Sequence, residues 1–357
     1  MIALGTGGIK PCVAAFGGDQ IESDNKKEEN LGRFFNFFYF AINLGSMLSS
    51  FISPLLSNIG CGKRLSCYPA AFGSSSILLA TSIILFYLGT KLYVKNKPKV
   101  GDMFNEISNI FNMMINYNTT KPEGIVEEHH INQTSENYNV LRILKLFIPI
   151  TFFWMLFDQQ TTTWVEQGFK MKDTSIIGNR NVQILSSQMQ TFNSIFIILF
   201  IPIFTKFIYP FFEYVGLKLT PIKKMGCGIF LASLSFIISA YVEHKINEYS
   251  LINQKISILW QLPQYLSLTA GEIMLNMTGL EFAYSEAPDT MKTLILSCWL
   301  LTVTLGNFFV ILYSSLDITK FINTNEADKY NFILYALMGL GASYIMFTLE
   351  KGYNKSK

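Results

Sequence analysis

Three charged residues lie inside otherwise apolar stretches of this 357-residue chain. Lys10 lies in the apolar opening stretch, Asp158 in FFWMLFDQQTTTWVEQ, and Glu272 in LPQYLSLTAGEIMLNMTGLEF with eight uncharged residues on either side. A charge in the middle of a membrane costs at least ~2.5 kcal/mol, so such residues usually face a cavity and serve a pathway. Each could instead form a structural ion pair between helices. We favour function for Glu272 and Lys10, and a local role for Asp158, which lies closer to the end of its stretch.

Other polar, aromatic and small residues recur at the spacing of a helix face. Such stripes are often packing seams between helices, but an embedded charge or neighbouring tryptophans favours a pathway. A cavity with one cation, one anion, amide donors and an aromatic wall would suit a small zwitterion, with its carboxylate at Lys10 and its ammonium at Glu272. The stripes are Tyr39, Asn43, Ser46 and Ser50; Tyr265, Thr269, Glu272, Asn276 and Gly279; Phe153, Phe157, Gln160 and Trp164, with Trp154 beside them; and Trp299 with Gly306. Gly45, Gly271, Gly279 and Gly306 are candidates for close helix contacts or bending.

Membrane-spanning helices must position these residues. Half of the chain is hydrophobic and only 15% is charged, against about 25% in soluble proteins. This composition excludes a disordered chain, a disulfide-dense secreted scaffold and most soluble enzymes, and a net charge of +3 gives no reason to expect nucleic acid as a partner. A spanning helix needs about 20 apolar residues. Eight stretches qualify and a ninth, residues 1–16, resembles the end of a helix; the eight are 34–56, 69–93, 143–167, 186–212, 225–243, 256–280, 293–315 and 331–349.

The distribution of Lys and Arg predicts the orientation. If loop 17–33 is cytoplasmic, cytoplasmic segments hold 18 basic residues and outside segments nine. Loop 98–141 and the C-terminus are then cytoplasmic. Cys61 and Cys67 fall on the outer side, where a disulfide is permitted but not required. No metal site is predicted, because His129 and His130 have no cysteine or carboxylate frame. The sequence contains no HExxH or GxSxG motif that would indicate an enzyme.

Several long motifs resemble the proton-coupled oligopeptide transporters of the major facilitator superfamily, especially the animal members. The motifs are GTGGIKPCVAAFGGDQ, RFFNFFYFAINLGSMLSSFISPLL, FFWMLFDQQTTTW and QLPQYLSLTAGEIMLNMTGLEFAYSEAPDTMKTLILSCWLLTVTLGN. The resemblance implies an all-α membrane bundle, with this chain running from span four to span twelve of the family's twelve and lacking spans one to three. It implies an incomplete amino-terminal half at 1–97, a cytoplasmic linker at 98–141 and a six-helix carboxy-terminal half at 142–357.

The resemblance also implies roles for individual residues. Lys10 matches the lysine of the peptide carboxylate site and of coupling, Glu272 the glutamate that binds the peptide amine, and Arg142 an arginine of the intracellular gate. The usual gate partner of Arg142 is replaced by Thr205, and an arginine that often follows FDQQ is replaced by Thr163. The remaining matches are cavity or pocket residues: Tyr39, Asn43, Phe153, Trp154, Phe157, Gln160, Asn193 and Trp299.

The favoured hypothesis is proton-driven import of di- and tripeptides by alternating access, with protons as coupling ion and no cofactor. The lipid bilayer is the expected surrounding, most simply the plasma membrane, and no obligate protein partner is inferred. One alternative is a transport-incompetent fragment or gene model of such a transporter. Another is a different small substrate, such as histidine or nitrate, although the carboxylate of Glu272 argues against an anion.

Overall fold

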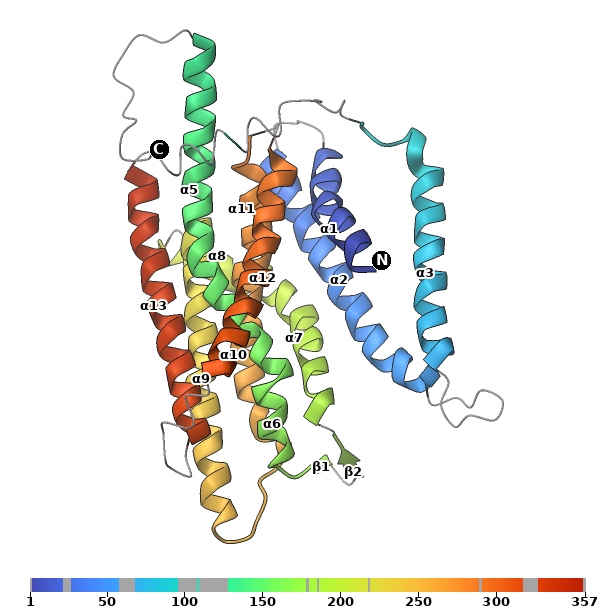
Figure 1. Ribbon diagram of the computed structural model, residues 1–357, viewed down its shortest axis with the longest axis vertical. Helices are drawn as coiled ribbons and strands as arrows, with labels where there is room; N and C mark the ends of the chain where they lie inside the picture. Colours follow the sequence, from blue (N-terminus) through green and yellow to red (C-terminus); the bar gives the residue numbers. More distant parts are fainter. Residues whose placement is uncertain are drawn as a thin grey trace.

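The computed structural model describes residues 2–21, 27–57, 68–95, 108, 128–177, 180–184, 186–217, 219–288, 291–316 and 327–355. Helices make up nearly all of this part of the chain and run roughly side by side (Figure 1). The longer helices are α1 (Ile2–Asp19), α2 (Lys27–Ser57), α3 (Tyr68–Leu88), α5 (Glu128–Phe157), α7 (Gln190–Ile203), α9 (Pro221–Ser250), α10 (Leu262–Glu272), α12 (Lys292–Leu316) and α13 (Ala327–Lys355).

Short elements connect or interrupt these helices. Two of them, η4 (Phe204–Ile208) and η6 (Ile273–Met277), are wider π-helical turns. The helices α6 (Thr163–Phe169), α8 (Tyr209–Tyr214) and α11 (Thr278–Ser285) continue α5, α7 and α10. The 3-10 turns are η1 (Gly89–Lys91), η2 (Asp158–Thr161), η3 (Ser186–Gln188) and η5 (Ile258–Gln261).

The structure is helical at every one of the nine predicted spans, which agrees with the predicted fold class. Six helical segments within the described residues are long and apolar enough to cross a membrane: 69–91, 140–169, 190–214, 221–250, 292–315 and 327–353. The expected spans at 1–16, 34–56 and 256–280 form helices but are not among these six. In the last of them, Gln264, Thr269, Glu272 and Asn276 replace apolar side chains and lower the hydropathy.

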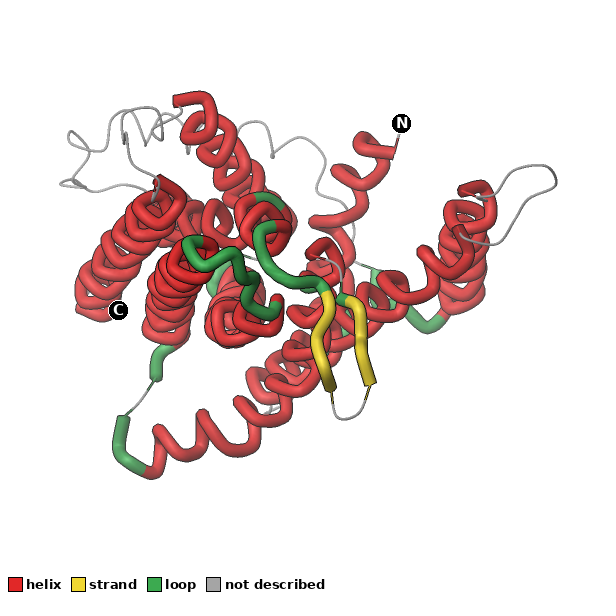
Figure 2. Tube along the Cα trace, turned by 90° about the horizontal axis from the view of Figure 1, so that it is seen from below, coloured by secondary structure: helices red, strands yellow, loops and turns green. Residues whose placement is uncertain are grey.

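Two local features differ from the sequence-based expectation. An antiparallel hairpin of β1 (Thr174–Ile177) and β2 (Arg180–Gln183) interrupts the all-helical pattern at one end of the bundle (Figure 2). It lies in a connection between spans, where strand pairing satisfies backbone groups that no helix uses. Helix α5 begins at Glu128, inside the segment expected to be a linker at 98–141, so part of that segment is a helix that projects beyond its neighbours (Figure 1).

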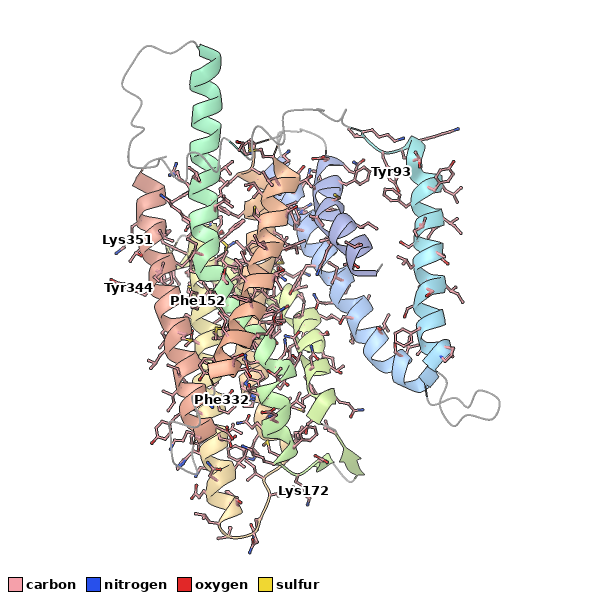
Figure 3. The ribbon with its side chains drawn as sticks, viewed as in Figure 1. Tyr93, Phe152, Lys172, Phe332, Tyr344 and Lys351 are labelled. Carbon is pink, nitrogen blue, oxygen red and sulfur yellow. The ribbon has the colours of Figure 1, made fainter. Side chains whose placement is uncertain are left out.

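The carboxy-terminal helices form a continuous core. Helix α9 packs against α13 and α10, and α5 packs against α12 and α13. Aromatic contacts join these pairs. Between α5 and α12, the rings of Phe152 and Phe309 stack with their centroids 5.7 Å apart (Figure 3). Between α13 and α9, the ring centroids of Phe332 and Phe236 lie 6.3 Å apart. This core supplies a fixed wall for the polar groups described below.

The amino-terminal helices contact this core more sparingly. Helix α1 packs against α12, and α2 packs against α7 and α11. Helix α3 contacts α2, and its Phe86 ring lies 5.5 Å from the Phe16 ring of α1, but none of its described side chains is buried. The segment after α3 returns to α1: Tyr93 lies 5.4 Å from the Phe16 ring, and Gln20 exchanges two hydrogen bonds with the backbone of Val94 (Figure 3).

Backbones of α9 and α10 touch at two glycines. A Cβ added to Gly228 would lie 2.6 Å from the carbonyl oxygen of Gly271, and one added to Gly271 would lie 2.5 Å from that of Gly228. The close contacts anticipated at Gly271, Gly279 and Gly306 are therefore present. A Cβ on Gly45 would meet nothing within 4 Å, so that glycine makes no such contact with the described residues.

Replacing Gly271 by alanine should force α9 and α10 apart. We expect this variant to lose about 1–3 kcal/mol of stability, the range for overpacking a tight interior. Thermal unfolding of the detergent-solubilised chain measures the loss. The matched control is Gly45→Ala, which adds the same methyl group in a helix where it meets nothing. Equal unfolding temperatures for the two variants would contradict the close packing of α9 on α10.

Candidate functional site

The carboxylate of Glu272 is buried and bonded on both oxygens. Glu272 is the last residue of α10, immediately before the π-helical turn η6. Its Oε2 accepts a hydrogen bond of 2.8 Å from Asn193 Nδ2 of α7, and its Oε1 accepts one from the Tyr39 hydroxyl of α2. A buried charge is tolerated when such donors satisfy it. Helices far apart in sequence therefore meet at one side chain.

A short chain of polar groups holds these donors in place. Asn193 Nδ2 also donates to Thr269 Oγ1 at 3.0 Å, and the Thr269 hydroxyl donates to the backbone oxygen of Tyr265 at 2.8 Å. Tyr265, Thr269 and Glu272 are all buried, so this predicted stripe does face the interior. On α2, Asn43 is buried and donates to the Tyr39 backbone oxygen at 2.9 Å.

The aromatic stripe lies where α5 ends. Phe153 and Phe157 stack with their ring centroids 6.0 Å apart, and the ring of Trp154 packs edge-on against both, at 5.3 and 5.4 Å. Gln160 follows in η2 and is buried. The Tyr265 hydroxyl lies 3.5 Å from the backbone oxygen of Gln160, which connects this aromatic group to the polar face of α10.

The model of the POT family matches residues 1–327 of this chain. The chain belongs to the POT family. Human "Solute carrier family 15 member 1" is 40% identical over 261 residues, covering 70% of this chain and 36% of the human protein. "Peptide transporter family 1" of Caenorhabditis elegans is 38% identical over 281 residues, covering 69% of this chain and 32% of its own length.

The crystal structure of the POT family transporter PepTSo has a TM-score of 0.74 and 28% identity, and it covers 100% of this chain and 78% of its own. The chain spans about a third of the length of the human and Caenorhabditis elegans relatives. POT-family relatives are transporters, which agrees with the prediction that the chain is not an enzyme. The family and the spans make the chain an integral membrane protein.

Of the predicted pocket residues, Tyr39 and Asn193 each contact Glu272 directly. Trp299 is elsewhere in the core. Its ring lies 5.6 Å from that of Phe147, and a Cβ added to Gly279 would lie 2.1 Å from it. Packing therefore surrounds Trp299, and its contact with a ligand stays a prediction.

The two basic residues of the predicted site, Lys10 and Arg142, are not among the donors to Glu272. Lys10 is exposed on α1 and forms no ion pair with the described part of the chain. Arg142 instead packs on α13: its guanidinium lies 4.5 Å from the centre of the Tyr353 ring, and Nη2 donates to the Tyr353 backbone oxygen at 2.7 Å. The Thr205 hydroxyl donates to its own helix at Ile201. The possible disulfide of Cys61 and Cys67 lies outside the described residues.

A polar contact between the end of α1 and the carboxy-terminal helices was not expected from the sequence. The Tyr284 hydroxyl donates to Asp19 Oδ1 at 2.6 Å, and Lys292 Nζ lies 3.9 Å from the same oxygen and 4.5 Å from the centre of the Tyr284 ring. These residues join the end of α1 to α11 and α12. Asp19 closes the quoted GGDQ motif and Lys292 opens a span, but nothing in their spacing indicates that they meet.

Glu243 is a second buried carboxylate that sequence reasoning missed. Lys170 Nζ donates to Glu243 Oε1 at 2.7 Å and to Asp328 Oδ2 at 2.6 Å, and Gln167 Nε2 donates to Glu243 Oε2 at 3.0 Å. This network ties α6, α9 and α13 together. Burial alone lowers the pKa of Lys170, but hydrogen bonds and attraction from Asp328 and Glu243 outweigh it and raise the pKa above its ordinary value.

Replacing Tyr39 by phenylalanine should leave one oxygen of the buried Glu272 carboxylate without its donor. An unsatisfied buried polar group costs about 1–3 kcal/mol, so the unfolding temperature should fall. The matched control is Tyr344→Phe, which removes a hydroxyl on the exposed face of α13 (Figure 3). If the two variants unfold at the same temperature, the Tyr39 hydroxyl does not stabilise Glu272.

Replacing Lys170 by methionine should destabilise the chain, because the buried carboxylate of Glu243 would lose its positively charged partner. The cost should fall between the ~0.2–1 kcal/mol of exposed pairs and the ~3–5 kcal/mol of buried ones, since Lys170 is partly exposed. A raised pKa means that the stabilisation is complete below the ordinary lysine value of about 10.4 and is lost as the pH rises through the raised value. The difference in unfolding temperature between Lys170→Met and wild type should therefore be constant near neutral pH and shrink only in strong alkali. The control is Lys172→Met, at an exposed lysine, which should change the unfolding temperature little.

Proposed function

We propose that this chain carries di- and tripeptides across a membrane, driven by the proton gradient, by alternating access. The observation that supports this most directly is the position of Glu272: a buried carboxylate whose two donors come from α2 and α7. A peptide ammonium is a stronger partner for a carboxylate than a neutral hydroxyl. The names of the relatives, a solute carrier and a peptide transporter, favour the same substrate class.

The contacts of Glu272 also suggest how binding couples to movement. An ammonium that takes Glu272 Oε1 would displace the Tyr39 hydroxyl and so release α2 from α10. A proton on Glu272 would likewise remove the negative charge that Tyr39 and Asn193 now stabilise. Release on the other side requires a second separation, because Asp19, Tyr284 and Lys292 join α1 to α11 and α12. Rocking about such contacts is the usual form of alternating access.

We also propose the plasma membrane as the location, with the C-terminus in the cytoplasm. The basic-residue bias supports this orientation. In that orientation the contact of Asp19 with Tyr284 and Lys292 lies on the cytoplasmic side. The exposed lysine Lys10 and the gate arginine Arg142 keep their proposed roles in coupling, each to be tested by neutral replacement.

Replacing Glu272 by glutamine should weaken peptides with a free amine far more than amine-blocked peptides. Losing one member of a buried charge pair costs about 2–5 kcal/mol, which is roughly 30-fold or more in affinity. The measurement is binding, and proton-driven uptake of a labelled, hydrolysis-resistant dipeptide, with the purified chain in lipid vesicles. A protonophore should abolish uptake.

The matched control is Glu243→Gln, which neutralises a buried carboxylate that is already paired with Lys170. It should not change the preference for a free amine. If Glu272→Gln lowers the affinity for free and amine-blocked peptides equally, Glu272 does not bind the peptide amine. Vesicles with folded chain but no concentrative uptake would favour the alternative of a transport-incompetent fragment.

A further inference from the structure

Three buried oxygens where α6, η3 and the start of α10 meet have no hydrogen-bond partner within the described part of the chain. They are Ser186 Oγ, Gln261 Oε1 and Gln264 Oε1. Ser186 is 3% exposed and both glutamines are 0% exposed, so bulk water does not reach them. Buried polar atoms in folded proteins are nearly always paired, so each of these oxygens calls for a partner.

The hydrogen bonds of Gln167 fix how the two other glutamine amides point. Gln167 Oε1 accepts from Gln261 Nε2 at 3.2 Å and from Gln264 Nε2 at 3.1 Å. Gln261 Nε2 also donates to the backbone oxygen of Trp164 at 2.8 Å. A flipped amide would place its oxygen against these acceptors, and an amide oxygen cannot donate. The unpaired Oε1 atoms are therefore correctly assigned, and both need a donor.

Ser186 and Gln261 approach the same point of α6. A Cβ added to Gly168 would lie 2.7 Å from Ser186 Oγ and 3.5 Å from Gln261 Oε1. The two oxygens are therefore no further apart than two hydrogen bonds of about 3.2 Å each, laid end to end. They do not bond each other directly, so one small ligand can bridge them. A side chain at Gly168 would collide with Ser186, which explains why this position is a glycine.

The surrounding charges favour a neutral ligand. Glu243, the carboxylate bonded to Gln167, already pairs with Lys170, and a buried cation without a carboxylate of its own is costly. The ligand must donate to Gln261 Oε1, whereas the Ser186 hydroxyl can donate or accept. Water is small and neutral and does both. A buried water typically makes about two to four hydrogen bonds to groups that the protein leaves unpaired.

We propose that one ordered water molecule binds between Ser186 and Gln261, beside Gly168. It accepts from the Ser186 hydroxyl and donates to Gln261 Oε1, and its second hydrogen is available to Gln264 Oε1. Ser186 lies in η3, just before α7, and Gln261 is the last residue of η5, just before α10. The water thus links the starts of the two helices that meet at Glu272, and this role does not depend on what the chain transports.

A crystal structure of the purified wild-type chain in lipid, at a resolution that shows ordered waters, tests the site directly. The expected result is a water oxygen about 2.5–3.0 Å from both Ser186 Oγ and Gln261 Oε1. A direct hydrogen bond between the two side chains, or no density between them, would overturn the proposal. A bound cation would overturn it too, and would make the unfolding temperature change when sodium salt is replaced by choline salt.

Replacing Ser186 by alanine gives an independent test, because the sign of the effect differs. If the water is bound, it loses a partner, and the unfolding temperature should fall by about 2 °C. If Ser186 Oγ is unpaired, alanine removes a buried unsatisfied hydroxyl, and an unchanged or higher unfolding temperature would refute the water site. The control is Ser315→Ala, at an exposed hydroxyl that bonds its own helix, which should change little. The wild-type structure decides the question even if Ser186→Ala does not fold.

Discussion

A carboxylate buried in an apolar medium must be satisfied by the protein itself, and this constraint shapes the centre of the molecule. Glu272 draws one donor from α2 and one from α7, so two helices separated from it by long stretches of sequence must come within hydrogen-bonding distance of α10. Thr269 then positions Asn193, and Asn43 braces α2. The same constraint recurs at Glu243, where Lys170 and Gln167 satisfy a second buried carboxylate.

Irregular helix turns coincide with these polar centres. Glu272 stands directly before the π-helical turn η6, and Asp158 opens the 3-10 turn η2 between α5 and α6. π-turns occur frequently at functional sites, and interruptions free backbone and side-chain groups that a regular helix would use internally. Next to Glu272 in the sequence, Gly271 packs against Gly228 and brings α10 into backbone contact with α9.

The asymmetry of the packing has consequences for movement. The carboxy-terminal helices share one extensive core, to which α1 and α2 contribute fewer buried apolar residues, among them Ala15 and Phe35. Polar contacts also join α1 and α2 to these helices, through Tyr39 at Glu272 and Asp19 at Tyr284 and Lys292. In these polar contacts, water or a ligand can replace one hydrogen-bonding partner at a low cost in free energy. A large apolar core allows no such exchange, so the flexible joints of the molecule are expected at these polar contacts.

Hydropathy and helical period are local properties, and they predicted the helical class, helices at the nine expected spans and the inward face of Tyr265, Thr269 and Glu272. Six helical segments among the described residues are long and apolar enough to cross a membrane. Long motifs also indicated the family. The packing of the helices shows which of them donate to Glu272, that Gly279 and Phe147 enclose Trp299, and that Lys10 is exposed. It also revealed the contacts of Asp19 with Lys292 and of Lys170 with Glu243. Pairings across such distances depend on how helices cross, and no local pattern in the chain encodes that angle and register.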